Sequence, residues 1–430
     1  MVVAPGWCVK KAGEQGSREV ADGLWPSRLT PASEQAMADR RPPFLLSRCL
    51  RIAAGGELTP RAIHLPPPSG ACLSVLPRCL GRHRDFLEWW RPHIRAVWRK
   101  RVTSKPGSNT WLDQVREPII DPERAIIDPH HHLWNRPDST YVLEDLWADT
   151  DSGHNIVKTV FLECGESYRE DGPEHLKPVG ETEFVEAIAS ASRERGGATI
   201  AGIVAHADLR SPHLDDVLDA HEAAGKGLFR GIRHYPPPEE LSMPGPSTEG
   251  LYQDEDFREG LARLGERGYT FDAWHFHHQN PAFRDLAAAV PGTTIILDHF
   301  GTPLGSGSYA GKREEIFAVW REDISAIAEC ANVIAKLGGL AMPFNGFGWD
   351  RRETPPTSDE FVELQRRYYD HTIQCFGTER CMFESNFPVD RRSLSYHVLW
   401  NGLKKIASHF SETEQASMFY GTAARIYRLE

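Results

Sequence analysis

The chain has 430 residues, of which 40% are hydrophobic and 25% charged, and its formal net charge is −11. This composition is typical of a globular enzyme, and no apolar run reaches the ~18 residues that a membrane-spanning helix needs. The 8 cysteines are scattered without a CxxC pair. That pattern argues against a disulfide scaffold or a cysteine zinc site, so we expect a cytoplasmic protein without a secretory signal.

The charge is divided unevenly along the chain. Residues 1–110 hold 18 Lys and Arg against 8 Asp and Glu, whereas the remaining 320 residues hold 31 against 52. The first part is also rich in proline, glycine and arginine and has little sustained periodicity. We therefore expect residues 1–110 to be a basic extension of low order, either a functional tail or an upstream stretch translated from a misplaced start. The acidic remainder argues against nucleic acid as a partner.

Residues 112–430 alternate short apolar strands with helix-length segments. Eight such strands predict a (β/α)₈ TIM barrel. A doubly wound sheet is the main rival, but it would normally carry a glycine-rich phosphate turn after its first strand, and none is present. The candidate strands lie within 125–132, 156–165, 198–209, 227–235, 268–279, 293–301, 332–339 and 380–388.

The ends of these strands carry an unusual number of polar residues, and the first ends in three consecutive histidines. Alternation along a strand directs His130 and His132 to one side and His131 to the other, toward the helices. Two imidazoles on one face can bind one divalent metal together. The alternative is that all three are hydrogen-bonded core residues. Histidines at other strand ends, His206, His277 and His299, favour the metal site because barrel enzymes place their active sites there.

Five motifs carry a resemblance to a known family: D-x-H-x-H-L-W at 128–134, VFLECG at 160–165, FRGIRH at 229–234, LDHFG at 297–301 and MFESNFPVD at 382–390. From about residue 112 to the C-terminus the sequence resembles the amidohydrolase-related family of TIM-barrel hydrolases, in its lactonase-like branch. The resemblance implies metal-binding histidines on strand 1, which are His130 and His132, and histidines on strands 5 and 6, which are His277 and His299. We expect His299 to serve as a third metal ligand. Zinc is the first choice of metal, and a metal-free mechanism is the alternative.

Strand 8 departs from the family pattern. The resemblance implies an aspartate where this chain has Asn386, and an amide has no basicity with which to accept a proton from water. Asn386 then orients water or substrate, and another group is the base. The candidates are Glu163, Asp390, His277 and His299. Glu384 lies deeper on the same face, where we expect it to pair with Lys336.

The substrate that the resemblance implies is a lactone or similar cyclic ester of a small organic acid. Arg233 is predicted to bind a substrate carboxylate, since a guanidinium offers two parallel hydrogen bonds, although pairing with Glu163 is the alternative. His206 and Trp274 are further substrate-binding candidates. Two other functions stay open, a metal-assisted decarboxylase on the same barrel and a barrel that binds a small acid without turnover. We expect no membrane partner, and a homo-oligomer is possible.

Overall fold

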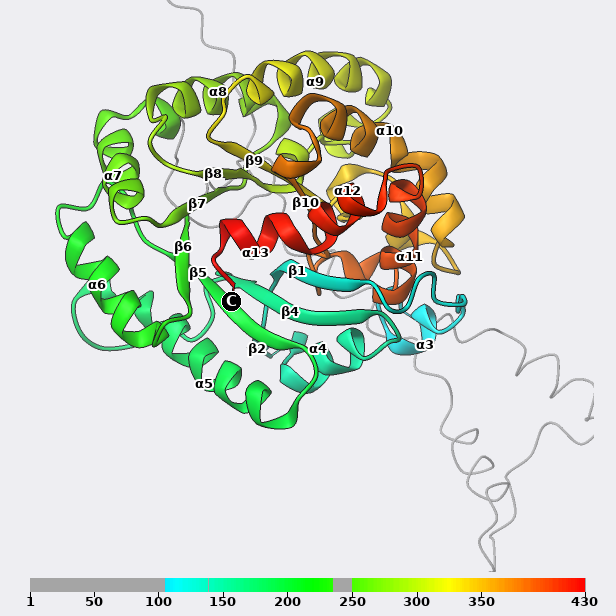
Figure 1. Ribbon diagram of the computed structural model, residues 1–430, viewed down its shortest axis with the longest axis horizontal. Coiled ribbons are helices and arrows are strands. Elements are labelled where there is room, and N and C mark those ends of the chain that lie inside the picture. Colours follow the sequence, from blue (N-terminus) through cyan, green and yellow to red (C-terminus); the bar gives the residue numbers. More distant parts are fainter. Residues whose placement is uncertain (1–104, 138, 235–249, 430) are drawn as a thin grey trace, which may run out of the picture. The chain divides into compact units, whose positions relative to one another are not determined.

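The computed structural model describes residues 105–137, 139–234 and 250–429. Its central feature is a sheet of eight parallel strands in which each strand neighbours the next along the chain (Figure 1). The strands are β1 (Ala125–His131), β4 (Asn155–Leu162), β5 (Thr199–His206), β6 (Phe229–Arg233), β7 (Thr270–Ala273), β8 (Ile295–Leu297), β9 (Val333–Leu337) and β10 (Cys381–Phe383).

The sheet closes on itself where β1 meets the segment that follows β10. His131 forms a parallel bridge with Phe387, the His132 amide donates to the Phe387 carbonyl at 2.8 Å, and the Asn386 amide donates to the His130 carbonyl at 3.0 Å. These bonds join the last strand to the first, which an open doubly wound sheet does not do. The predicted (β/α)₈ barrel is therefore confirmed.

Helices surround the strands in a ring, and a short hairpin of β2 (Trp134–Arg136) and β3 (Ser139–Tyr141) precedes the first of them (Figure 1). Their apolar faces pack on the outward-facing side chains of the strands. None of the helices among the described residues is long and apolar enough to cross a membrane. The helices that follow the hairpin are α4 (Leu143–Thr150), α5 (Val179–Arg195), α6 (Leu214–Gly225), α7 (Glu255–Glu266), α8 (Asn280–Ala289), α9 (Arg313–Ala328), α10 (Ser358–Phe376), α11 (Tyr396–Ala407), α12 (Glu412–Ala416) and α13 (Thr422–Ile426).

The barrel interior is a second, smaller apolar cluster that α13 and the residues after it complete. Tyr427 packs there against strand residues such as Val160 and Ile334, and α13 crosses one end of the barrel in Figure 1. The Tyr427 hydroxyl donates to Asp272 Oδ1 at 2.6 Å. The end of the chain thus covers the barrel interior and reaches a buried charge inside it.

Ordered packing begins ahead of the predicted barrel boundary. A helical turn, α3 (Asn109–Leu112), places Trp111 in the core with no exposed surface, and the Trp111 indole N–H donates to the Arg352 carbonyl at 3.1 Å. Asn109 and Thr110, which were assigned to the extension, therefore belong to this turn. Residues 1–104 of the predicted extension lie outside the described residues.

Candidate functional site

The three consecutive histidines divide between the two sides of the barrel wall. His131 faces outward, where its Nε2 lies 3.1 Å from Thr159 Oγ1 and its ring packs on Phe161. His130 and His132 share the other side, with their Nε2 atoms 3.3 Å apart. All three are buried. Strand alternation therefore predicted their directions correctly.

His299 joins His130 from the opposite wall. It follows β8 in the turn η5 (Asp298–Gly301) with φ of 52°, a left-handed conformation that is uncommon for residues other than glycine. The rings of His130 and His299 have centroids 4.5 Å apart. Backbone conformations of this kind are stored at functional sites when the surrounding packing imposes them.

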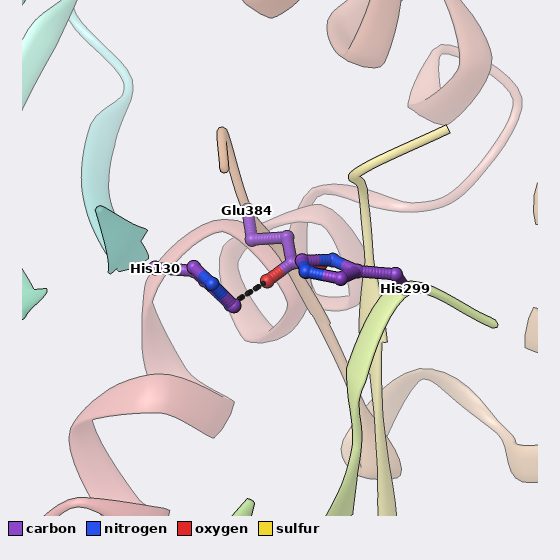
Figure 2. Close-up of side chains that lie close together, drawn as sticks. All are labelled: His130, His299 and Glu384. Atoms are coloured by element: carbon purple, nitrogen blue, oxygen red, sulfur yellow. Dashed lines mark hydrogen bonds and ion pairs between the residues drawn. The ribbon is translucent and has the colours of Figure 1, made fainter. Parts of the chain in front are cut away.

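Glu384, directly after β10, lies between these two rings (Figure 2). Its Oε2 is 2.7 Å from His130 Nδ1, and its Oε1 is 2.6 Å from His299 Nδ1. Two glycines after β9 make room for this arrangement. A Cβ on Gly339 would lie 2.2 Å from His299 Nδ1, and one on Gly338 would lie 2.4 Å from the Glu384 side chain. Any larger residue at either position would displace the cluster.

The hydrogen bonds determine which ring nitrogens carry protons. His132 Nδ1 lies 2.8 Å from the Leu162 carbonyl, which only accepts, so the proton of a neutral His132 is on Nδ1. His130 Nδ1 lies 3.3 Å from the Lys336 ammonium, which only donates, so Nδ1 accepts and the proton of a neutral His130 is on Nε2. His130 Nε2 then donates to the lone pair of His132 Nε2 at 3.3 Å. A cation held by both Nε2 atoms would replace this proton.

The imidazoles are held neutral, the form that binds metals. Burial lowers the pKa of His130 and of His132 well below the usual value, and it lowers the pKa of His299 to about 3. The nearby Lys336 also lowers the pKa of His130 and His299, whereas Asp298 opposes the shift at His299.

Acidic groups outnumber cations beneath the histidines. Lys336 Nζ lies 2.6 Å from Asp272 Oδ1 and 3.2 Å from Asp298 Oδ1, so the predicted pairing of Lys336 with Glu384 was wrong. It failed because two acids from β7 and η5 are nearer to the ammonium than Glu384, which faces the imidazoles. Burial raises the pKa of Glu384 to about 8, with Lys336 opposing the shift and Asp272 adding to it. Burial likewise raises the pKa of Asp298 to about 6.

These groups fit a divalent cation. Ligand atoms of His130, His299 and Glu384 all lie within 4.8 Å of one another, and the Nε2 atoms of His130 and His132 lie 3.3 Å apart. A positive charge beside the buried acids would also favour the ionised form of Glu384. Because both oxygens of Glu384 touch ring Nδ1 atoms, its carboxylate is placed to orient the imidazoles, with their Nε2 atoms left for a metal.

Asn386 is tied to a neighbouring acid. It has φ of 57°, which asparagine tolerates better than most residues, and its Nδ2 donates to Asp390 Oδ1 at 2.9 Å. Asp390 Oδ2 accepts from the Ala341 amide at 3.1 Å, and burial raises the pKa of Asp390 well above its usual value. Both oxygens of Asp390 thus already accept hydrogen bonds, which leaves fewer lone pairs for a water or a substrate.

The predicted substrate-binding residues His206, Arg233 and Trp274 lie at the ends of β5, β6 and β7. Arg233 Nε donates to Glu163 Oε1 at 2.8 Å, and another guanidinium nitrogen contacts the Glu163 carbonyl, so the pairing considered as the alternative for Arg233 is present. His206 Nδ1 lies 3.2 Å from the Arg233 carbonyl. The Arg233 guanidinium lies 6.0 Å from the Trp274 ring centroid.

His277 is not on a strand, which corrects its placement within the predicted strand 268–279. β7 ends at Ala273, and His277 opens the turn η4 (His277–Gln279). His277 Nδ1 accepts from the Leu304 amide at 3.3 Å. His275 packs on Phe283 and lies 3.0 Å from the Asn280 side chain. The predicted strand was too long because the chain leaves the sheet before these residues.

The sequence of this chain is similar to those of known proteins. The sequence model of the amidohydrolase family, described as "Amidohydrolase", matches residues 127–429. The chain belongs to the amidohydrolase family. The matched region contains every residue of the histidine cluster.

Individual relatives agree with this assignment. An L-fucono-1,5-lactonase of Burkholderia multivorans is 30% identical over 318 residues, which are 70% of this chain and 96% of that protein. The "Uncharacterized protein y4mH" of Sinorhizobium fredii is 32% identical and covers 71% of this chain and 99% of its own length. Crystal structures of a Burkholderia multivorans amidohydrolase, one with HEPES and one with zinc bound, share the fold with a TM-score of 0.57 at 24% identity. They cover 71% of this chain and 100% of their own.

Proposed function

We propose that this amidohydrolase hydrolyses a lactone of a small sugar acid or related organic acid, with a divalent metal ion, zinc first, as its cofactor. The observation that supports the metal is that the Nε2 atoms of His130 and His132 face each other 3.3 Å apart, close enough for both to bind one ion. The L-fucono-1,5-lactonase relative supports the substrate class. A lactone carbonyl and an attacking water both gain from a nearby positive charge.

The residues of the site have separate roles in this proposal. His130, His132 and His299 would hold the ion through Nε2. Glu384 would then accept from Nδ1 of His130 and His299, and the Leu162 carbonyl from Nδ1 of His132. When bound, the ion would polarise a carbonyl or lower the pKa of water. Arg233 would meet a substrate carboxylate from the face away from Glu163, with Trp274 and His206 beside it.

Of the four candidates for the general base, two are disfavoured by their contacts. Asp390 has both oxygens engaged, and burial lowers the pKa of His299 to about 3. Glu163 accepts a hydrogen bond from Arg233 at one oxygen, and His277 Nδ1 accepts from the Leu304 amide, so the proton of a neutral His277 is on Nε2. We propose that Glu163 accepts the proton and that His277 donates its Nε2 proton to the departing oxygen.

The test is a hydrolysis screen of the zinc-loaded chain. Five- and six-membered lactones of sugar acids and lactones of dicarboxylates would be assayed by proton release. We expect turnover of at least one lactone, and its loss in His130→Ala. Turnover that survives His130→Ala would overturn the role of the metal. If no lactone reacts while aromatic carboxylic acids release carbon dioxide, the decarboxylase is the better assignment, since Asn386 need not be basic there.

A further inference from the structure

A second group of metal-binding side chains lies outside the barrel. His175 is in the turn η1 (Glu174–Leu176), within the connection that follows β4. His213 immediately precedes α6, and Asp216 lies in the first turn of that helix, after β5. Since β4 and β5 are neighbouring parallel strands, both connections leave the same end of the barrel. These three residues thus lie at the rim of the end that carries the histidine cluster, and none of them belongs to that cluster.

These three side chains are close enough to share one ion once the two rings turn their lone pairs toward it. The rings of His175 and His213 stack with centroids 4.4 Å apart and planes inclined by 16°, and His213 Nδ1 lies 3.8 Å from Asp216 Oδ2. One ligand atom from each residue lies within 4.8 Å of the others. Two imidazole nitrogens and a carboxylate oxygen are a donor set that zinc uses with water in a fourth position.

The backbone holds both segments in place. The His213 amide donates to Ser211 Oγ at 3.1 Å, and the Leu214 amide donates to the Ser211 carbonyl at 3.1 Å. On the other side, the Arg169 amide donates to the Lys177 carbonyl at 3.0 Å, which closes the loop around His175. Because the ligands' backbones are fixed, an ion would need to order only side chains.

Asp216 can serve as the carboxylate ligand because the acids next to these residues pair with basic side chains. The neighbouring Asp215 pairs with Arg263 at 2.9 Å, and Glu174 pairs with Lys177 at 2.7 Å. Among the described residues, His213 is the only ion-pair partner found for Asp216. His213 and Asp216 are exposed and His175 is partly so, which gives an ion access.

We propose that His175, His213 and Asp216 form a second divalent transition-metal site, of the zinc class, that cross-links the β4–α5 connection to the start of α6. The connection it would fix begins at Glu163, the partner of Arg233. Imidazole ligands favour zinc, nickel or copper over magnesium, so magnesium would not occupy the site. This site is additional to the metal of the proposed hydrolysis and does not depend on it.

The experiment is equilibrium dialysis of the full chain against micromolar zinc, with zinc per chain measured by mass spectrometry. We expect His175→Ala and His213→Ala each to bind one zinc ion fewer than the wild type. Zinc, but not magnesium, should also raise the melting temperature of the wild type more than that of either variant. Without added metal, all three proteins should melt together, which shows that the variants fold.

Two matched controls sharpen this test. His409→Ala removes an exposed histidine from elsewhere on the surface, and Asp215→Asn changes an acid next to Asp216; both should retain the wild-type zinc content. Equal zinc content and equal zinc-induced stabilisation in the wild type and both histidine variants would overturn the proposal. Loss in His213→Ala without loss in His175→Ala would overturn it too, because the site requires both connections.

Discussion

Two groups of buried polar side chains lie at the end of β1, and they differ in how completely their atoms are partnered. Asp128 accepts from the Ser385 amide at 2.9 Å, from Ser385 Oγ at 2.6 Å and from the Tyr396 hydroxyl at 2.8 Å. Two residues further on, His130 Nε2 lies 3.3 Å from His132 Nε2, and the buried Glu384 Oε2 beside His130 makes no hydrogen bond to any of the described residues. The satisfied hydrogen bonds of Asp128 join β1 to the segments that follow β10. The carboxylate oxygen of Glu384, beside two facing imidazole nitrogens, can receive a cation.

The largest effect should come from removing a facing imidazole. His130→Ala or His132→Ala should abolish binding of the central metal and lower lactone turnover by at least about 10²-fold, because a ligand and its positioning are lost. His131→Ala is the matched control. It should retain metal and turnover and lose about 2 kcal/mol of unfolding free energy, as buried residues outside a site commonly do. Zinc content and urea denaturation measure both, and equal metal loss in all three variants would contradict the division between the two sides.

Disrupting the hydrogen bonds of Asp128 should lower stability and leave the central metal bound. Asp128→Asn places an amide N–H₂ where Ser385 and Tyr396 donate, so the free energy of unfolding should fall by about 1–3 kcal/mol. The central metal should stay bound, because the histidines keep their own partners. Urea denaturation and zinc content, measured on the same preparation, check this. Loss of metal at unchanged stability would show that Asp128 belongs to the ligand cluster.

Asn386 should have an intermediate effect. Asn386→Ala removes the hydrogen bond to Asp390 and places alanine at a left-handed φ, so we expect about tenfold lower turnover, the scale of one orienting hydrogen bond. Asn386→Gly is the control, since it removes the same amide while tolerating the backbone conformation. Both variants should be slowed alike, and Asn386→Ala alone should lose about 1 kcal/mol of stability. Turnover abolished in both would make Asn386 essential to the chemistry.

The smallest effect is expected from truncation. A chain that starts at Lys105 keeps the turn that buries Trp111, so its melting temperature and zinc content should equal those of the full chain. The two proteins would be compared by thermal denaturation and metal analysis. A drop of several degrees in melting temperature would mean that residues 1–104 stabilise the barrel.

The sequence predicted those features that local patterns determine. The alternation of strands and helices gave the barrel, and alternation within β1 gave the directions of His130, His131 and His132. The predicted strand 268–279 was too long and wrongly included His277, because β7 ends at Ala273 and a strand's end depends on pairing with distant strands. The position of Glu384 between two imidazoles was also missed. That position depends on the space left by Gly338 and Gly339, which no local periodicity reveals.

We propose that a divalent cation occupies the space between the Nε2 atoms of His130 and His132. Anomalous diffraction at the zinc absorption edge, from crystals grown with zinc, tests it most directly. We expect an anomalous peak in contact with Nε2 of His130, His132 and His299, with Glu384 in contact with Nδ1 of His130 and His299. Zinc-supplemented crystals without a peak at this position, or with one bound at the Nδ1 atoms, would contradict it.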